Sequence, residues 1–513
     1  MNYRYYAVIL SLLAVFFISS CGTDRIAEIY SINLESTIAI ANERRSLVFE
    51  RDMDRIQREI YGKNPSIIND PRIFSNTPRS VLVTSEEALE DIEIFFSLLR
   101  NLYGAYNHFG GDEVFIPLFD KIKAEISTTE SQVSVMLGML LRDFLSDYIS
   151  DNHFAIDGVT VGSQTHVFIW DSPFDRSRNG FRHRESQKYA VEIVGHSISE
   201  IMRLAVTESG EFFYVPIVML PSVYGITYDL QIDFQDEGIR TISLRHTLFP
   251  MLNSSADIQT VLNMEYEFPV VSLRPNMPSP FAISNETFGF SSDNAVSFLS
   301  FAEMLINEPV IILDLRSNAG GFSILSTLWL YKLLDEFVPY GFYYIMPSGI
   351  VLPDDMYSLS PSWYLFFNHD EQDTINSQVL EVSRKVEMIT LLKQGTQIND
   401  YHSVIGKADR VVSNDLLLIL LVDRHTASAA EIFTRQILNI ENTLVIGQNT
   451  SGTLLTSGSL PLWMPNSGIP FHMGWNFMAL PDDGNQREGF GISPDVWVLG
   501  DALTAALAIL NNR

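Results

Sequence analysis

The stretch Asp415–Gly452, DLLLILLVDRHTASAAEIFTRQILNIENTLVIGQNTSG, decides how the rest of the chain can fold. It begins with an apolar run, Leu416–Val422, which has the length and composition of a strand buried on both faces. The segment AAEIFTRQIL that follows carries apolar residues at helical spacing. Ser428 therefore lies at the junction from strand to helix, where unpaired N–H groups and the helix dipole favour negative charge.

Ser428 has two interpretations. Serine is a favoured N-cap, so a strand followed by serine and a helix is most often only a helix start. The small neighbours Ala427, Ala429 and Ala430, however, leave room for a substrate backbone to approach the hydroxyl. Other parts of the sequence favour the second interpretation, in which Ser428 is a nucleophile.

A second strand, turn and helix precede this stretch. Residues 310–315 form another apolar run, 316–321 a glycine turn and 323–337 a helical pattern. Strands that alternate with helices predict an α/β core with a mostly parallel sheet, in which both turns lie at one carboxyl edge. The Gly320-Gly321 turn can present bare N–H groups, as an oxyanion hole requires, although such a turn can also serve chain geometry alone.

The upstream chain predicts two further parts. Apolar stripes over 85–106 and about 130–149 indicate a small helical bundle. Period-two patterns between glycine turns over 155–250 indicate a β-rich module. The predicted organisation is a signal segment at 1–20, a linker region at 21–84, the bundle at 85–150, the module at 151–255 and the α/β core at 256–513.

The composition is that of a folded protein, with 46% hydrophobic and 19% charged residues. A formal net charge of −28 argues against nucleic acid as a partner, because few cations remain to neutralise phosphates. The sequence has no cluster of histidine, cysteine and acidic residues at metal-binding spacing, so we expect no metal and no cofactor.

The first twenty residues resemble an export signal. Arg4 gives a basic start, and 7–18 is an apolar segment too short to span a bilayer. The segment ends at Ile18-Ser19-Ser20-Cys21-Gly22, and Cys21 is the only cysteine in the chain. This pattern resembles a bacterial lipoprotein signal, which implies a lipidated Cys21 and a membrane-anchored location in the cell envelope, periplasmic or at the cell surface. An ordinary secretory signal is the alternative.

Five ordered motifs resemble those of the C-terminal-processing and tricorn-type serine peptidases. They are DNHF at 151–154, LDLRSNAGG at 313–321, TASAAEIF at 426–433, GQNTSG at 447–452 and GFGISPDVWV at 489–498. The resemblance implies a ClpP/crotonase-like core, a PDZ-like character for the β-rich module, and protein or peptide substrates.

The family divides by its general base. One branch uses a lysine just after the G-x-x-T-x-G motif, where this chain has Thr453; its last lysine is Lys407, so no lysine follows Ser428. The tricorn-like branch uses a histidine and a glutamate, which correspond to His153 and Glu488. Asn152 stands where tricorn-type members have a serine before the histidine, and it can still form hydrogen bonds.

The sequence leaves the general base and the oxyanion donors with more than one candidate. His425, three residues before Ser428, and His472, in a predicted strand, are the other candidate bases. We expect the oxyanion to be held by the N–H groups of Ala429 and of Gly320 or Gly321. We expect Asp423 and Arg424 to form a structural ion pair.

The predicted function is that of an exported serine endopeptidase. The alternative is a surface lipoprotein that keeps the fold as a peptide-binding module without turnover. A binding module needs none of Ser428, His153 and Glu488, so their joint presence favours the enzyme. The sequence predicts neither the substrate nor the oligomeric state.

Overall fold

The computed structural model describes the greater part of the chain. The described ranges are 33–46, 71–74, 82–128, 131–162, 165–221, 227–246, 259–274, 282–283, 288–289, 293–321, 323–336, 338, 340, 343–347, 396–399, 402–405, 412–458, 460–479 and 486–512. The predicted signal segment, its Cys21 and most of the predicted linker lie outside these ranges. Among the described residues, no helix is both long enough and apolar enough to cross a bilayer.

The α/β core is built on a run of parallel strands. In spatial order they are β14 (Val270–Arg274), β17 (Val310–Asp314), β21 (Leu417–Val422), β22 (Thr443–Gly447), β29 (Val496–Val498) and β9 (Met202–Val206). The antiparallel strand β13 (Gln259–Asn263) lies outside β14. Every residue of β17, β21 and β22 is buried, as their continuous apolar sequences predict for strands covered on both faces.

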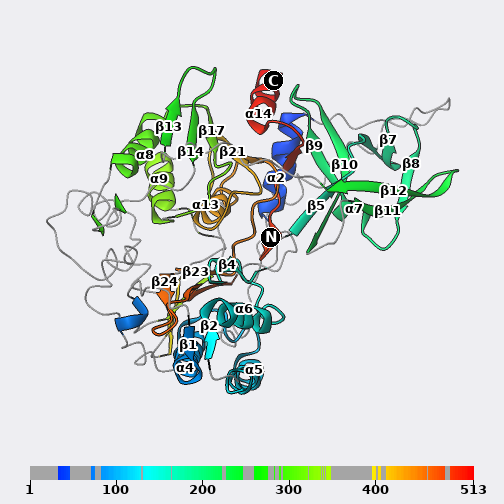
Figure 1. Ribbon diagram of the computed structural model, residues 1–513. Coiled ribbons are helices and arrows are strands. Elements are labelled where there is room, and N and C mark those ends of the chain that lie inside the picture. Colours follow the sequence, from blue (N-terminus) through cyan, green and yellow to red (C-terminus); the bar gives the residue numbers. More distant parts are fainter. Residues whose placement is uncertain are drawn as a thin grey trace, which may run out of the picture.

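Helices cover both faces of this parallel sheet (Figure 1). On one face lie α8 (Asp293–Met304), α9 (Ile324–Leu334) and α13 (Ala429–Ile437), and on the other lie α2 (Leu34–Ser46) and α14 (Ala502–Asn511). Alternate residues of β21 serve the two layers: Leu418 and Leu420 pack with the first set of helices, Ile419 and Leu421 with the second. The predicted α/β class is confirmed.

The sheet continues beyond β9 into an antiparallel module. Its strands, in spatial order, are β10 (Phe212–Pro221), β5 (Thr165–Ile169), β12 (Gly238–His246), β11 (Thr227–Phe234), β8 (Tyr189–Ile193), β7 (Gly180–His183) and β6 (Phe174–Ser177). β9 pairs in parallel with β29 and antiparallel with β10, so the core and the β-rich module share one large mixed sheet. The PDZ-like character of the module stays a prediction.

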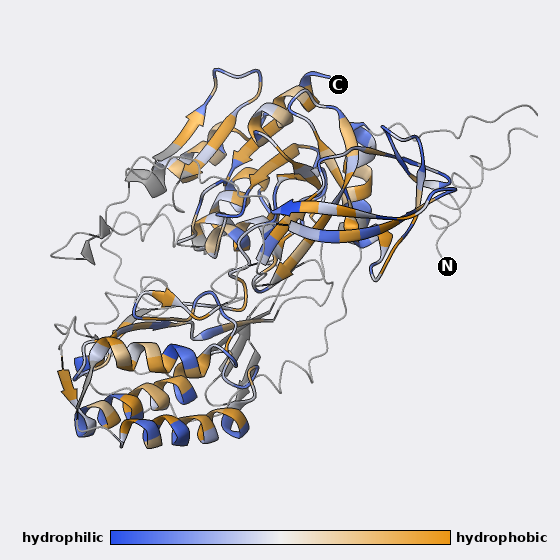
Figure 2. Ribbon diagram, turned by 45° about the vertical axis from the view of Figure 1, so that its right-hand side comes forward, coloured by the Kyte–Doolittle hydropathy of each residue, from blue (hydrophilic) through white to orange (hydrophobic). Residues whose placement is uncertain are grey.

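A third part, which we call the helical lobe, lies against the carboxyl edge of the parallel strands (Figure 1). Its elements are α4 (Ser85–Leu102), α5 (Gly111–Ile126), α6 (Ser134–Leu145), β24 (Leu460–Trp463), β25 (Pro470–Met473), β3 (Ala155–Ile156) and β4 (Val159–Thr160). Phe95 of α4 packs edge-on against Phe154 and Phe471, which joins the helices to these strands. Figure 2 shows the apolar faces of the helices turned toward each other and toward the strands.

Two predictions about this region need correction. The β-rich module does not begin at residue 151: β3 and β4 form a hairpin that pairs with β25 in the helical lobe, and β5 is the first strand of the module. The short glycine turn at Gly158 makes this division possible, because its φ of 72° suits a tight reversal. The predicted helix at 130–149 is shorter, and β2 (Ser131–Val133) precedes α6.

Candidate active site

Ser428 lies on a tight turn between β21 and α13. Its φ of 53° and ψ of −118° are unusual for a residue with a side chain and indicate a strained backbone. The turn is held by Glu431, because its Oε2 accepts a hydrogen bond from the Ser428 N–H at 2.9 Å. The arrangement places the hydroxyl at the carboxyl edge of the sheet, as predicted for a site of this kind.

His153 meets Ser428 across the junction between the core and the helical lobe. Its Nε2 lies 2.9 Å from Ser428 Oγ, although 275 positions separate the two residues. Burial lowers the pKa of His153 below its ordinary value, and the charge of Asp151 opposes this effect only in part. The neutral imidazole that a general base needs is therefore favoured.

The two other candidate histidines lie on neighbouring elements. His472 is in β25, where its main chain pairs with Ala155 just beyond His153. His425 follows β21, and its N–H donates to Asp423 Oδ1 at 2.9 Å. The contact between His153 and Ser428 favours His153 as the base.

Asp151 is a buried acid that sequence reasoning did not single out. It is fully buried, and its Oδ1 accepts a hydrogen bond from the His153 N–H at 2.9 Å. Its Oδ2 accepts from the Tyr103 hydroxyl at 2.8 Å and from Thr456 Oγ1 at 2.7 Å. The only sequence signal was its place two positions before His153 in the DNHF motif.

Glu488 contacts the turn that carries His153, but through the main chain. Its Oε1 accepts from the Asn152 N–H at 2.6 Å, and its Oε2 accepts from the N–H groups of Leu454 and Leu455 at 2.6 and 2.7 Å. Burial, and then the charge of Asp151, raise the pKa of Glu488 well above its ordinary value. Glu488 thus ties the His153 turn to the loop after Gly452.

The side chain of Asn152 does not link His153 to Glu488. Its side-chain Nδ2 donates to the Gly452 carbonyl at 3.0 Å. His153 Nδ1 is buried and has no hydrogen-bond partner among the described residues. The amide of Asn152 is aimed at the loop instead of the imidazole, which explains why a serine-based pattern does not transfer to it.

The glycine turn after β17 lies directly against the nucleophile. A Cβ on Gly320 would lie 2.7 Å from the Cβ of Ser428 and from the Ala427 oxygen. The Gly320 N–H already donates to Asn318 Oδ1 at 2.9 Å, so this group is occupied. Of the two glycines that the sequence left open, Gly321, with a φ of 133°, is the better candidate to present an N–H to an oxyanion. Ala429 begins α13, where an N–H has no acceptor within the helix.

Glu431 explains why the GQNTSG motif accompanies the nucleophile. It is fully buried, and its Oε1 accepts from Thr450 Oγ1 at 2.5 Å and from the Gly452 N–H at 2.8 Å. Its Oε2 accepts from the Thr453 N–H at 2.9 Å, in addition to the Ser428 N–H. Burial raises the pKa of Glu431, and these four hydrogen bonds act against that rise. One carboxylate therefore fixes both the nucleophile turn and the adjacent loop.

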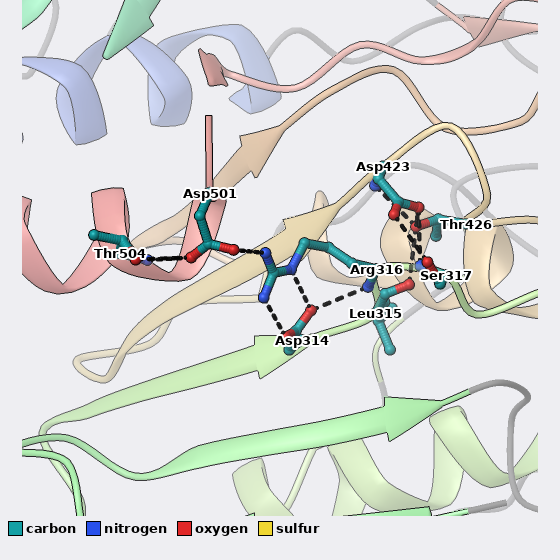
Figure 3. Close-up of polar contacts among 8 residues, drawn as sticks. All are labelled: Asp314, Leu315, Arg316, Ser317, Asp423, Thr426, Asp501 and Thr504. Carbon is teal, nitrogen blue, oxygen red and sulfur yellow. Dashed lines mark hydrogen bonds and ion pairs between the residues drawn. The ribbon is translucent and has the colours of Figure 1, made fainter. Parts of the chain in front are cut away.

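A second polar cluster supports the edge of the sheet (Figure 3). Arg316 forms a two-pronged pair with Asp314, with both distances 2.8 Å, and contacts Asp501 at the start of α14 at 2.6 Å. Asp423 accepts a hydrogen bond from the Ser317 N–H at 2.9 Å. The Asp and Arg of the LDLRSNAGG motif are therefore structural.

The predicted ion pair between Asp423 and Arg424 is not formed. Both residues are described, and each bonds elsewhere: Asp423 accepts from Ser317 and from main-chain N–H groups. Arg424 donates to the carbonyls of Thr450 at 2.7 Å and Thr165 at 3.1 Å. Neighbouring residues at the end of a strand point in different directions, which separates the two side chains.

A serine hydroxyl in contact with a part-buried histidine, beside a glycine turn, is the arrangement of a serine hydrolase. Residues 369–498 match the model of peptidase family S41, and this range holds the nucleophile segment, the GQNTSG motif, Glu488 and the closing motif. The match covers about a quarter of the chain, and it supports the resemblance to the C-terminal-processing and tricorn-type serine peptidases that the sequence motifs carry.

The chain is also similar to several solved structures at low identity. Mature CPAF is 13% identical, with 83% of this chain and 95% of that chain covered and a TM-score of 0.41. The photosystem II D1 C-terminal processing protease is 13% identical, with coverage of 82% and 94% and a TM-score of 0.32. The tricorn protease is 13% identical, with coverage of 84% and 35% and a TM-score of 0.31. No curated relative matches the chain by sequence.

Proposed function

We propose that this protein is an exported, lipid-anchored serine endopeptidase that cleaves protein or peptide substrates through an acyl-enzyme. The observation that carries the proposal is the 2.9 Å contact between His153 Nε2 and Ser428 Oγ. A serine hydroxyl is a weak nucleophile near neutral pH, and a neutral imidazole at this distance can remove its proton during attack.

In the proposed reaction, Ser428 Oγ bonds to the scissile carbonyl carbon while its proton passes to His153 Nε2. The carbonyl oxygen becomes an oxyanion and accepts hydrogen bonds from the N–H groups of Ala429 and Gly321. His153 then returns the proton to the leaving amine as the C–N bond breaks. In the second half, a water attacks the ester with His153 again as base, and Ser428 is released.

The location and the partners follow from the sequence. A lipidated Cys21 would anchor the protein to a membrane of the bacterial cell envelope, on the periplasmic or surface side. The anchor would make the membrane a partner in addition to the protein or peptide substrates. The acidic chain offers nucleic acid little to bind.

Labelling with a fluorophosphonate probe tests the chemistry without knowledge of the substrate. We expect the purified wild type to label and to digest casein, and both activities to fall by about a factor of 10⁴ or more in Ser428→Ala. Ser413→Ala, which removes a serine bonded to Glu441 on another part of the core, is the matched control and should label normally.

The general base is tested in the same assay by replacing single histidines with alanine. His153→Ala should label far more slowly than wild type, whereas His472→Ala should stay close to it. The reverse result would move the base to His472. A folded wild type that neither labels nor digests casein would instead favour the peptide-binding lipoprotein.

A further inference from the structure

Two acids contact the turn that carries His153, the fully buried Asp151 and the part-buried Glu488, and their surroundings differ. Glu488 uses both carboxylate oxygens on main-chain N–H groups, those of Asn152, Leu454 and Leu455. Its contact with the His153 turn is made to Asn152, the residue before the histidine, and not to His153. Glu488 is therefore placed to hold two loops together.

Asp151 is connected to His153 more closely. Its Oδ1 accepts a hydrogen bond from the main-chain N–H of His153 at 2.9 Å, and its carbonyl accepts one from the Phe154 N–H at 3.1 Å. One residue therefore fixes the main chain at His153 and at the residue after it. Tyr103 and Thr456, both buried, donate hydrogen bonds to the other oxygen from the helical lobe and from β23 (Thr456–Ser457). The carboxylate thus sits where three segments meet behind His153.

The donor set suits an ionised carboxylate at Asp151. A main-chain N–H and two hydroxyls all donate to it, and hydrogen bonds to a charged acceptor are stronger than those to a neutral one. The charge of Asp151 is among the causes that push Glu488 toward its neutral form.

We propose that Asp151, and not Glu488, is the positioning residue that orients His153 and stabilises its protonated form during catalysis. Glu488 then acts as a loop anchor. The inference rests on the proposed function, because it concerns the proton that His153 takes from Ser428.

Other ionisable groups lie on the elements packed around His153. Tyr103 follows α4, and its hydroxyl donates a hydrogen bond to Asp151; burial together with the charge of Asp151 raises the pKa of Tyr103 well above the ordinary value. Glu431 in α13 is satisfied by four donors behind Ser428. His472 in β25 has a pKa lowered by burial, which favours its neutral form. Asp151 is the anion among them that bonds to the His153 residue itself.

The test compares Asp151→Asn with Glu488→Gln in the full-length protein. For each, the second-order rate constant of labelling by an alkyl fluorophosphonate is measured across pH, and folding is followed by thermal unfolding. For Asp151→Asn we expect the plateau rate to fall about 100-fold, the scale on which a misplaced catalytic group costs rate. The acidic limb of its pH–rate profile should move to lower pH, because the Asp151 carboxylate no longer stabilises protonated His153. Glu488→Gln should leave the acid limb where it is in wild type.

A third variant covers the case in which Asp151→Asn does not fold. Tyr103→Phe keeps the carboxylate and removes one donor, and we expect a several-fold slower labelling rate with the fold retained. An unchanged rate and pH profile in folded Tyr103→Phe would then overturn the inference. So would an acid limb that moves in Glu488→Gln but stays fixed in Asp151→Asn. A wild type that does not label would overturn the proposed function itself, and this inference with it.

Discussion

At the scale of single residues, burial sets the pH range in which His153 can act as a base. Its pKa lies below the ordinary value of 6.5, with burial as the largest cause. A base must be neutral, and a lowered pKa keeps the neutral form at lower pH. We therefore expect the labelling rate of wild type to reach half of its plateau value at a pH below 6.5. A half-maximal rate at or above pH 6.5 would contradict this.

Glu431 gives a second prediction at this scale. In Glu431→Gln, the side-chain NH₂ would face N–H donors that now bond to a carboxylate oxygen. We expect the free energy of unfolding to fall by about 2 kcal/mol, the cost of leaving a buried polar group unsatisfied. Labelling of Ser428 should slow as well, because the Ser428 N–H loses its acceptor. Chemical denaturation and labelling measure the two effects, and an unchanged variant in both would show that the carboxylate holds nothing essential.

The residues themselves could be predicted from the sequence only in part. The patterns around Ser428 and His153 predict a nucleophile and a base, and the structure brings the two side chains together. The contacts of Asn152 and the occupied N–H of Gly320 could not be predicted, because they depend on side-chain directions set by packing. Asp151 was overlooked because its partners, Tyr103 and Thr456, come from segments far away in the sequence.

At the scale of elements, the turn between β17 and α9 packs closely against Ser428. Gly320 has a φ of 100°, and a Cβ there would lie 2.9 Å from the Ala429 nitrogen as well as against Ser428. We expect Gly320→Ala to slow labelling by at least about 100-fold, the cost of losing an oxyanion donor, because the turn must shift.

Gly238→Ala is the matched control for this turn. Gly238 has a φ of 77° in the turn between β11 and β12, and a Cβ there would meet no atom within 4 Å. The substitution should cost about 1 kcal/mol of backbone strain and leave labelling unchanged. Equal labelling by the two variants would show that the close approach at Gly320 does not matter.

Long elements of clear pattern were predicted, and short or interrupted ones were not. β17 and β21 are buried runs of aliphatic residues, which the sequence displays without ambiguity. α5 was missed: it begins at Gly110-Gly111 and contains Pro117, both of which normally argue against a helix. Its packing against the rest of the helical lobe, through Phe115 and Leu118, overrides those preferences.

At the scale of the whole molecule, Arg316 links the parallel sheet to the C-terminal helix. It is almost fully buried, and it joins Asp314 at the end of β17 to Asp501, the N-cap of α14. We expect Arg316→Met to lower the free energy of unfolding by about 4 kcal/mol, because it leaves the buried Asp314 without its counter-charge. Lys332→Met, which breaks a more exposed pair with Glu303 between α9 and α8, should cost no more than about 1 kcal/mol. Equal losses in chemical denaturation would refute this difference.

At the scale of the molecule and a membrane together, a lipid on Cys21 would act through the short segment that joins it to α2. α2 is fixed to the core, since Leu34 and Ala41 are buried against the layer that contains α14. Only residues 22–33 separate Cys21 from α2, and a fully extended chain of that length spans about 45 Å. A lipidated Cys21 would therefore keep the whole enzyme close to the bilayer surface.

Cys21→Ala should remove the anchor and leave the enzyme intact. We expect wild type to incorporate a fatty-acid analogue and to sediment with membranes, and the variant to do neither. Casein digestion and fluorophosphonate labelling should be equal in the two proteins, because Ser428 and His153 are held by contacts within the core and the helical lobe. Equal absence of the fatty-acid label in both would end the lipoprotein assignment. A variant that loses labelling by the probe would show instead that the N-terminal segment supports the site directly.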